Sequence, residues 1–400
     1  MGFEVRAVRP EEREACLELW CRVWSENGRS FFHRYLFADD TWLPHYTQVG
    51  VLDGKIVSAV QIVRRKVACG EMWLTMGGLA NVSTLPEYRG QGFNTACLQR
   101  ALAVMEAEGM DFSALGTGIP GYYERIGYTI FPLPEVEGAV RQPLPSGSAD
   151  IGVRAARADD LPTIRAIYAD YNRHRPLTFE RTPSYWRYWI GLSEESDPKG
   201  MLVGQDEEGQ VIAYLCYSTF EREGQRYGEV SEMGLADREG VRTERVVLTL
   251  LTALCWQEEI RFLRAHIALD PEVCSALEQV LEKPIPCYNR GGMLRLLHRT
   301  ELFQKLLPLF DQRWVEQGRP AGRVGFETPY GPIALEGAGE ALILKRVEEG
   351  EGILPQVHFF QLLFGTARPH HLTEDRAQQR FLDALFPPRK APVFYRADGF

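Results

Sequence analysis

The spacing of apolar and polar positions in the first third of the chain alternates between strand and helix periods. Residues 3–8 have the two-residue period of a strand, and residues 11–24 carry an apolar stripe at helical spacing. Asp53-Gly54 separates two β-branched runs and predicts a hairpin turn. The further expected elements are a strand around Trp73, a helix that ends near Gly109, a strand at 112–115, a short helix at 120–123 and a strand at 128–130.

A similar order of elements recurs after residues 142–150, whose Pro, Ser and Gly content predicts a linker. The repeat indicates an internal duplication. Its expected elements are a strand at 153–154, a helix from Asp160, a hairpin around 206–209, a strand at 227–235 and a helix at 242–256.

The pattern changes again from about residue 300. Strands and helices there follow one another in a way that predicts an α+β layer. The expected elements are a helix at 302–314, strands at 322–327, 331–336 and 341–347, an apolar segment at 359–364 and a helix at 376–385.

Composition narrows the class of protein. Four hundred residues with 45% apolar content suit two to four globular domains. A net charge of −9 argues against nucleic acid or an anionic membrane as a partner. The longest apolar run, 246–256, is too short to span a bilayer, and the N-terminus lacks a signal-peptide pattern, so a cytoplasmic location is expected.

Cysteine and histidine spacing predicts no metal site. The cysteines form no C-x-x-C pair and stand at 16, 21, 69, 97, 216, 255, 274 and 287. We expect them to be small core residues, Cys97 included. The adjacent pair His370-His371 has no evident third ligand and is expected in a loop.

The stretch Val82–Asn94 is the most informative for function. It joins a β-branched run to a turn with Gly90 and Gly92, and a helix follows. Such glycines let successive backbone amides converge on one point, and the helix dipole adds positive potential there. Together with the Arg89 guanidinium, the turn therefore predicts a site for an anion.

The flanking residues separate three kinds of phosphate site. The Lys-Ser/Thr pair of a P-loop and the G-x-G-x-x-G of a Rossmann turn are both missing. The segment instead resembles the coenzyme A motif of the GCN5-related N-acetyltransferases, with Asn94 where Gly or Ala is usual. The resemblance implies bound acetyl-CoA. The residues expected to hold it are Val82, Thr84, Arg89, Gly90, Gln91, Gly92, Phe93, Asn94 and Thr95.

The corresponding stretch of the repeat, residues 235–242, lacks the proline and the second glycine. Glu239 brings a negative charge to the turn. We therefore expect the second module to bind no coenzyme A.

The segment 121–128 resembles the G-x-Y-x-R-F-G-Y segment of the Eis (enhanced intracellular survival) family, with Ile126 in place of Phe. This resemblance covers essentially the whole chain. It implies an α+β fold with an active acetyltransferase module at 1–141, a degenerate one at 151–298 and a domain similar to sterol carrier proteins at 299–400. It also implies a homo-oligomer, hexamer or trimer.

The resemblance also implies catalytic roles. Tyr123 would be the general acid that protonates the leaving thiolate, and the terminal carboxylate of Phe400 would be the general base. The expected acceptor is a small cationic amine or a peptide lysine, as in aminoglycosides, polyamines or exposed lysine side chains. Candidate substrate contacts are Trp20, Trp24, Glu26, Phe31 and Asp398.

Two other functions stay open. A lipid-binding or scaffold protein with vestigial modules would use only the third domain, and the intact Arg89–Gly92 turn argues against it. A single-module enzyme that acetylates an amino acid or a ribosomal protein fits the first 140 residues and leaves the rest unexplained.

Overall fold

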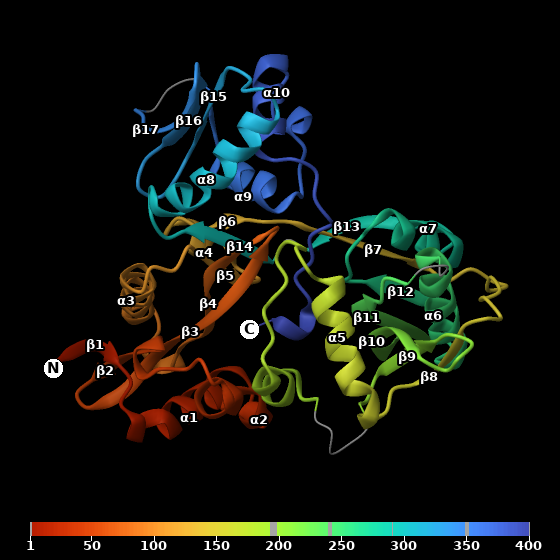
Figure 1. Cartoon of the computed structure of the whole chain (residues 1–400). Helices are drawn as coiled ribbons and strands as arrows, with labels where there is room; N and C mark the ends of the chain where they lie inside the picture. Colours follow the sequence, from red (N-terminus) through yellow and green to blue (C-terminus); the bar gives the residue numbers. More distant parts are fainter. Residues whose placement is uncertain (1, 193–197, 239–241, 290, 349–351, 400) are drawn as a thin grey trace.

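The computed structural model describes residues 2–192, 198–238, 242–289, 291–348 and 352–399. These residues form two seven-stranded sheets and one four-stranded sheet. Figure 1 shows three bodies: the first sheet with the N-terminus, the second sheet beside it, and the small third sheet above the first. No helix in these ranges is long and apolar enough to cross a bilayer.

The first sheet has the order β1-β2-β3-β4-β5-β14-β6. All neighbours pair antiparallel except β4 and β5, which run parallel. Its strands are β1 (Phe3–Ala7), β2 (Thr47–Leu52), β3 (Lys55–Cys69), β4 (Met72–Thr84), β5 (Phe112–Gly116), β14 (Gly292–Leu296) and β6 (Thr129–Ile130).

Helices cover both faces of this sheet. Along β3, Ala59 and Val63 belong to the same buried cluster as α1, whereas Val60 and Ile62 belong to that of α3. Because side chains alternate along a strand, α1 and α3 lie on opposite faces. The helices of this body are α1 (Arg13–Trp24), α2 (Arg29–His33), η3 (Arg34–Ala38), α3 (Phe93–Ala107) and α4 (Pro120–Glu124), with short turns η1 (Pro10–Glu12), η2 (Glu26–Gly28), η4 (Pro44–Tyr46) and η5 (Pro86–Tyr88).

The second sheet repeats the first in order and strand direction. Read from its outer edge it runs β8-β9-β10-β11-β12-β7-β13, and again the fourth and fifth strands are the parallel pair. Its strands are β8 (Gly152–Ala155), β9 (Met201–Gln205), β10 (Val211–Arg222), β11 (Gln225–Leu235), β12 (Phe262–Ala265), β7 (Leu133–Ala139) and β13 (Ile285–Asn289). Its helices are η6 (Ala158–Asp160), α5 (Leu161–Tyr171), η7 (Tyr185–Ile190), α6 (Thr243–Gln257) and α7 (Pro271–Val280).

The two sheets exchange one strand each. β14 follows the second set of elements in sequence but lies between β5 and β6 of the first sheet. Conversely, β7 follows the first set and lies between β12 and β13. The domain boundaries expected at 141 and 298 therefore do not separate the sheets cleanly, because each boundary leaves a strand in the other sheet.

The third body packs directly on the first. Its elements are α8 (Glu301–Glu316), β15 (Gly322–Phe326), β16 (Ile333–Ala338), β17 (Ala341–Arg346), β18 (Ile353–Leu354), α9 (Gln356–Phe364), η8 (Pro369–His371), α10 (Arg376–Leu385) and, in the C-terminal segment, η9 (Arg396–Asp398). The ring of Phe364 lies 5.6 Å from that of Phe112 and 6.0 Å from that of Phe131, so the two bodies share a core. Phe303, Phe326 and Phe359 fill the interior beneath the small sheet.

The C-terminal segment, residues 391–399, returns from the third body and runs between the two large sheets (Figure 1). Tyr395 is fully buried, and its hydroxyl donates to the backbone oxygen of Met233 in β11 (3.1 Å). This contact lies just beyond the parallel pairing of β11 and β12, which ends at Val230. The segment therefore occupies the place where these two strands separate.

Candidate active site

A cavity of about 1180 Å³ opens where β4 and β5 separate. The two strands pair only at Met76–Gly78, opposite residues 112–114, whereas β4 continues to Thr84. From Leu79 onward β5 therefore leaves one edge of β4 unpaired. The cavity is lined by both strands, by α1, α2 and the starts of α3 and α4.

A β-bulge shapes the wall of this cavity. Ala59 stands opposite Ser83 and Gln61 opposite Ala80, so two residues of β4 oppose one of β3. The two are Asn81, which has a positive φ of 51°, and Val82. Both residues leave the regular ladder with β3, and both line the cavity.

The glycine turn forms one end of the cavity. Gly90 and Gly92 have φ values of 76° and 82°, and Gly92 is the N-cap of α3. A Cβ at either glycine would meet no atom within 4 Å. The turn is thus an open cradle of backbone amides at the N-terminus of a helix, which fits a pyrophosphate. Arg89 lies beside it and donates from Nε to the Thr84 oxygen (3.3 Å).

Eight of the nine residues expected to hold coenzyme A line this cavity: Val82, Thr84, Arg89, Gly90, Gly92, Phe93, Asn94 and Thr95. Gln91 is exposed and is not among the lining residues. Gln91 is part of the turn itself, because it stands between Gly90 and Gly92, which both have positive φ.

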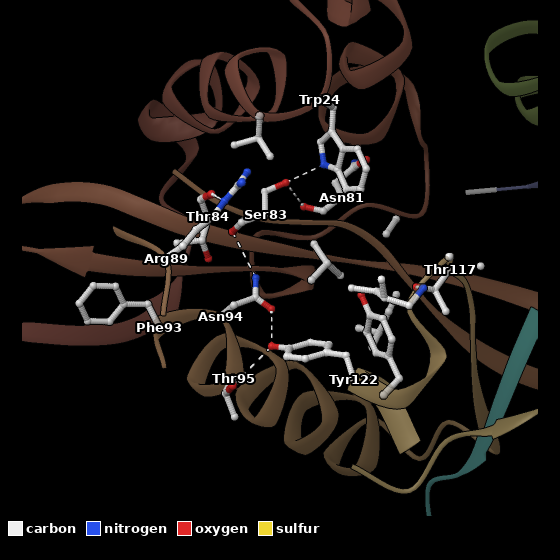
Figure 2. Close-up of a pocket in the computed structure, with 18 of the residues that line it drawn as sticks. Trp24, Asn81, Ser83, Thr84, Arg89, Phe93, Asn94, Thr95, Thr117 and Tyr122 are labelled. Atoms are coloured by element: carbon white, nitrogen blue, oxygen red, sulfur yellow. Dashed lines mark hydrogen bonds between the residues drawn. The ribbon is translucent and has the colours of Figure 1, made fainter. Parts of the chain in front are cut away.

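Asn94 holds the cavity wall together, as Figure 2 shows. Its side-chain nitrogen donates to the backbone oxygen of Ser83 (3.3 Å), and its side-chain oxygen accepts from the Tyr122 hydroxyl (3.2 Å). The residue that departs from the usual motif thus joins β4, α3 and α4. Trp24 adds a second link, since its Nε1 donates to Ser83 Oγ (2.8 Å).

Tyr123 and Tyr122 both line the cavity but differ in their contacts. Tyr123 is 7% exposed, and burial, with a contribution from Tyr122, raises the pKa of its phenol to about 12. Its hydroxyl makes no hydrogen bond to any residue that the structure describes. The Tyr122 hydroxyl instead forms hydrogen bonds with the side chains of Asn94 and Thr95. Tyr123 is therefore the phenol that can donate to a ligand.

The structure sorts the five expected substrate contacts. Trp24 and Phe31 line the cavity. Trp20 does not: it is completely buried in the core, because it lies on the inner face of α1. Glu26 is exposed in η2 and is not a lining residue.

Asp398 is also removed from the cavity. It is 1% exposed, and Arg181 binds it through two hydrogen bonds of 2.9 Å. The Tyr185 hydroxyl donates to the same carboxyl group (2.9 Å). Burial raises the pKa of Asp398 against the opposing effect of Arg181. The expectation that Asp398 contacts substrate is corrected by these contacts.

Phe400 lies outside the described residues, but its neighbour is held close to the cavity. Arg34 donates to the backbone oxygen of Gly399 (3.4 Å). The same guanidinium stacks on the ring of Phe31, with its carbon 4.1 Å from the ring centroid. The last described residue is thus tied to a cavity-lining aromatic side chain.

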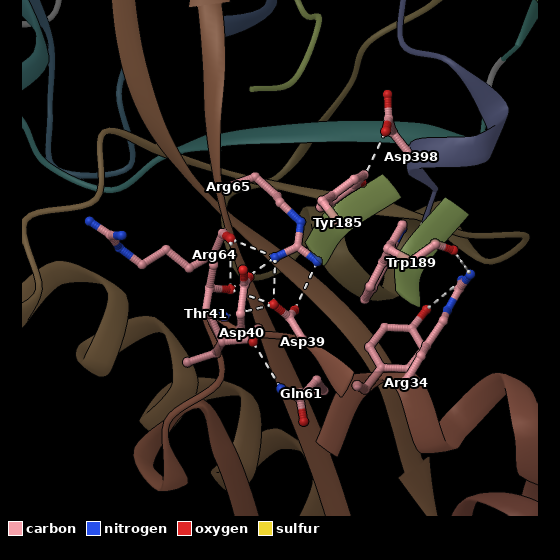
Figure 3. A network of polar contacts seen from close by, with 12 residues as sticks. Arg34, Asp39, Asp40, Thr41, Gln61, Arg64, Arg65, Tyr185, Trp189 and Asp398 are labelled. Atoms are coloured by element: carbon pink, nitrogen blue, oxygen red, sulfur yellow. Dashed lines mark hydrogen bonds and ion pairs between the residues drawn. The ribbon is translucent and has the colours of Figure 1, made fainter. Parts of the chain in front are cut away.

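A buried polar network surrounds this anchor (Figure 3). Arg65 and Asp39 form an ion pair of 2.8 Å, and both side chains are nearly inaccessible. Arg65 also stacks on Tyr185, which donates to Asp398. The network joins η3, β3, η7 and the C-terminal segment, and so fixes how the two large bodies meet beside the cavity.

The second body offers no comparable cradle among its described residues. Residues 239–241, which include Glu239, lie outside them, so the expected loss of a second coenzyme site stays a prediction. The structure adds a reason for it: where β11 leaves β12, Tyr395 and Val393 are packed among Tyr168, Trp186 and Tyr214.

Sequence reasoning missed several lining residues. Tyr35 comes from η3, and Thr117 and Ile119 come from the loop after β5. The loop could have been found, because it directly follows a strand next to the motif strand. Among the described residues no group of histidine, cysteine or carboxylate side chains could hold a metal ion.

Comparisons with known proteins agree with this geometry. Residues 4–131 match the family model of an acetyltransferase (GNAT) domain. Over 76 residues the chain is 34% identical to phosphinothricin N-acetyltransferase of Streptomyces coelicolor. That stretch is 18% of this chain and 43% of the relative, so the chain spans less than half of the relative's length.

Solved structures resemble the whole chain. A GCN5-related N-acetyltransferase from Anabaena variabilis has a TM-score of 0.71 at 13% identity, covering 98% of this chain and all of its own. A probable N-acyltransferase from Enterococcus faecalis has a TM-score of 0.70 at 16% sequence identity. Eis1 from Mycobacterium abscessus has a TM-score of 0.63 at 14% sequence identity. Both matches cover all of this chain and all of the other chain.

The fold and the cavity therefore define a protein with a GCN5-related N-acetyltransferase domain near its N-terminus. The predicted α+β fold with mixed sheets is confirmed. At these low identities the likeness to Eis1 concerns the fold alone. The assignments of a degenerate second module and a sterol-carrier-like third domain stay predictions.

Proposed function

We propose that this protein transfers the acetyl group of acetyl-CoA to an amine in the cavity between β4 and β5. The observation that carries the proposal is the glycine cradle at Gly90 and Gly92, which opens into a cavity that also contains a buried phenol. The cradle would bind the pyrophosphate, and the unpaired edge of β4 would bond the pantetheine amides as an added strand does.

In the proposed reaction the amine nitrogen attacks the thioester carbon, the new C–N bond forms and the C–S bond breaks. A backbone N–H at the bulge of Asn81 and Val82 is placed to stabilise the oxyanion. Tyr123 donates its proton to the leaving sulfur, and the raised pKa keeps this phenol protonated at neutral pH.

A base must take one proton from the ammonium before attack, because only the neutral amine is a nucleophile. The nitrogen loses a second proton after attack, and this proton replaces the one that Tyr123 gives to the sulfur. We propose the terminal carboxylate of Phe400 as the base. The anchoring of Gly399 by Arg34 supports it, since Arg34 also contacts the cavity through Phe31. Deleting Phe400, or extending the chain by a few small residues, should each lower kcat by about 100-fold while acetyl-CoA affinity changes little. Full activity of the extended protein would assign the base to another group.

Acetyl-CoA binding can be measured separately from the reaction. Acetyl-CoA at 100 times its dissociation constant should stabilise the fold by about 2.7 kcal/mol, seen as a rise in Tm. The protein should also release free thiol from acetyl-CoA in the presence of an amine. A lipid-binding or scaffold protein would show neither effect.

For the acceptor, the resemblance to the Eis family points to aminoglycosides, polyamines or lysine side chains. A homo-oligomer, hexamer or trimer, and a cytoplasmic location belong to the same proposal. Light scattering that gives the mass of the 45.5 kDa monomer at micromolar concentration would reject the oligomer.

A further inference from the structure

The phenol proposed as the acid stands on a weakly supported helix. α4 has only five residues, and a single helical turn gains little stability from its own hydrogen bonds. The loop before it contains Gly116 and Gly118, and a Cβ at either glycine would meet no atom within 4 Å, so the packing around both is open. The position of the Tyr123 hydroxyl therefore depends on the side chains that its ring contacts.

Two tyrosines flank the ring of Tyr123. The ring centroids of Tyr122 and Tyr123 are 5.1 Å apart at an interplanar angle of 89°, and those of Tyr123 and Tyr128 are 6.1 Å apart at 77°. Aromatic pairs favour such edge-to-face contacts. Tyr128 is fixed to the first sheet, because its hydroxyl shares a hydrogen bond of 2.6 Å with Ser113 Oγ in β5. The placement of Tyr123 then depends on what holds Tyr122.

The start of α3 holds Tyr122, as Figure 2 shows. The Tyr122 hydroxyl donates to Asn94 Oδ1 (3.2 Å), and Asn94 Nδ2 donates to the backbone oxygen of Ser83 in β4 (3.3 Å). Asn94 is the second residue of α3 and follows the N-cap, Gly92, by two positions. One carboxamide therefore joins the glycine cradle to a tyrosine that flanks the proposed acid.

Coenzyme binding alone does not account for the Asn94 side chain. The cradle consists of backbone amides, and the Gly or Ala that is usual at this position of the motif would leave those amides in place. Neither residue could bond Tyr122. The contact of the Tyr122 hydroxyl with Thr95 Oγ1 is longer, at 3.4 Å, and therefore weaker. Without the Asn94 side chain, Tyr122 would depend on this weaker contact.

We infer that Asn94 is a positioning residue for the proposed acid. Through Tyr122 it holds the phenol of Tyr123 at a fixed place relative to coenzyme A bound in the cradle. The inference rests on the proposed function and adds a residue to the same site. Proton transfer to the leaving sulfur needs the donor within hydrogen-bond reach, so the loss of Asn94 should lower kcat and leave coenzyme affinity unchanged.

The first test uses Asn94→Ala, which introduces a residue that is usual in the motif. The rise in Tm with acetyl-CoA should equal that of the unsubstituted protein. Turnover is measured as thiol release with kanamycin or spermidine, whichever reacts faster. Its kcat should fall by about 10-fold, since misplacement by about 1 Å can cost up to about 100-fold. Tyr122→Phe should lower kcat to a similar extent.

Tyr46→Phe is the matched control. Tyr46 belongs to the same buried cluster as Tyr123 but does not line the cavity, and its hydroxyl donates to Glu108 (3.4 Å). The substitution removes a phenol hydrogen bond from the same core and leaves the contacts of Asn94 in place. Its kcat should stay within about twofold of that of the unsubstituted protein, because distant sites act independently.

A double-mutant cycle separates positioning from a general structural effect. In Tyr123→Phe the acid is gone, so Asn94 has no proton donor to place. Adding Asn94→Ala to Tyr123→Phe should therefore lower kcat by less than about twofold. A residue that only supports the fold would lower kcat by the same factor in both backgrounds.

The outcomes distinguish the inference from the proposed function. If Asn94→Ala keeps full kcat, or lowers it equally in both backgrounds, the inference is wrong and the acetyltransferase function stands. If Asn94→Ala abolishes the rise in Tm with acetyl-CoA, Asn94 serves coenzyme binding and the inference is wrong. If Tyr123→Phe keeps full kcat, another group is the acid and the inference fails. If the unsubstituted protein shows neither a rise in Tm nor thiol release, the proposed function fails as well.

Discussion

Arg181 binds Asp398 through a two-point contact, Nε to Oδ1 and Nη2 to Oδ2, each at 2.9 Å. The same guanidinium contacts Glu232 through two further hydrogen bonds, of 2.9 and 2.7 Å. One arginine of the second body thus fixes both its own strand β11 and the C-terminal segment.

Replacing Arg181 by methionine should therefore strongly destabilise the protein. Two buried carboxylates would lose their partner, which typically costs about 3–5 kcal/mol. Arg173→Met is the control, because its ion pair with Asp170 is exposed and should matter by less than about 1 kcal/mol. Urea denaturation of both variants measures the difference. Equal, small effects would contradict a structural role for the Arg181 contacts.

The glycine cradle gives a prediction with a matched control. Gly92→Ala places a Cβ at a positive φ inside the proposed phosphate site, so KM for acetyl-CoA should rise by at least about 10-fold. Gly224 has a similar φ of 73° and open space around it, but lies in the β10–β11 hairpin. Gly224→Ala should lower Tm and leave KM unchanged. A similar rise in KM in both variants would show that backbone strain alone is responsible.

The two cavity tyrosines should differ in kinetics. Tyr123→Phe removes the proposed acid and should lower kcat by about 100-fold or more, with little change in acetyl-CoA binding. Tyr122→Phe removes only the contacts to Asn94 and Thr95 and should have a smaller effect.

The pH profile adds a further check on Tyr123. Because its pKa is raised to about 12, the proton is present at all lower pH values. We therefore expect no alkaline fall in kcat from Tyr123 below about pH 11. An alkaline limb near pH 9 that Tyr123→Phe abolishes would contradict the raised pKa.

The carboxylate of Glu12 should contribute to stability only above a defined pH. Arg6 binds the Glu12 carboxylate through two hydrogen bonds of 2.7 Å. These hydrogen bonds are the main cause that lowers the pKa of Glu12 from 4.5 to about 2. A carboxyl group whose pKa is lowered by folding stabilises the folded state at pH values above its pKa in the unfolded chain. That stability is lost as the pH falls from about 4.5 towards 2. Glu12→Gln should thus lower Tm at pH 7, and the difference from the unsubstituted protein should shrink by pH 3.5. A constant difference would contradict this linkage.

The exchange of β7 and β14 predicts the behaviour of fragments. Residues 1–141 alone lack β14, so the partner of β5 is missing and its edge is exposed. This fragment should aggregate and fail to bind acetyl-CoA. Co-expression with residues 142–400 should restore a soluble complex. A stable, acetyl-CoA-binding fragment 1–141 would show that β14 is dispensable.

Much of the fold follows from local patterns in the sequence. The Asp53-Gly54 turn, the helix that starts after Gly92 and the strand at 112–115 all stand where periodicity and glycine spacing place them. These features depend on neighbouring residues, which is why the sequence reveals them. The glycine cradle was predictable for the same reason.

Contacts between distant segments were not predictable in this way. Nothing in the local pattern of residues 292–296 says that they pair with β5, because strand partners are set by tertiary packing. Trp20 and Trp24 are both aromatic residues on α1, yet one is buried and the other exposed. Asp398 looked like a free carboxylate until the structure placed Arg181 beside it.

The strand exchange also sets an order of events during synthesis. The first sheet is incomplete until β14 has left the ribosome. β14 leaves the ribosome long after β6 does, because more than 150 residues separate the two strands. At typical rates of about 5–20 residues per second, the nascent chain holds an incomplete sheet for roughly 10–30 s. During that interval the exposed edge of β5 is open to wrong partners, so slower translation or loss of chaperones should reduce the yield of soluble protein before it affects the finished molecule.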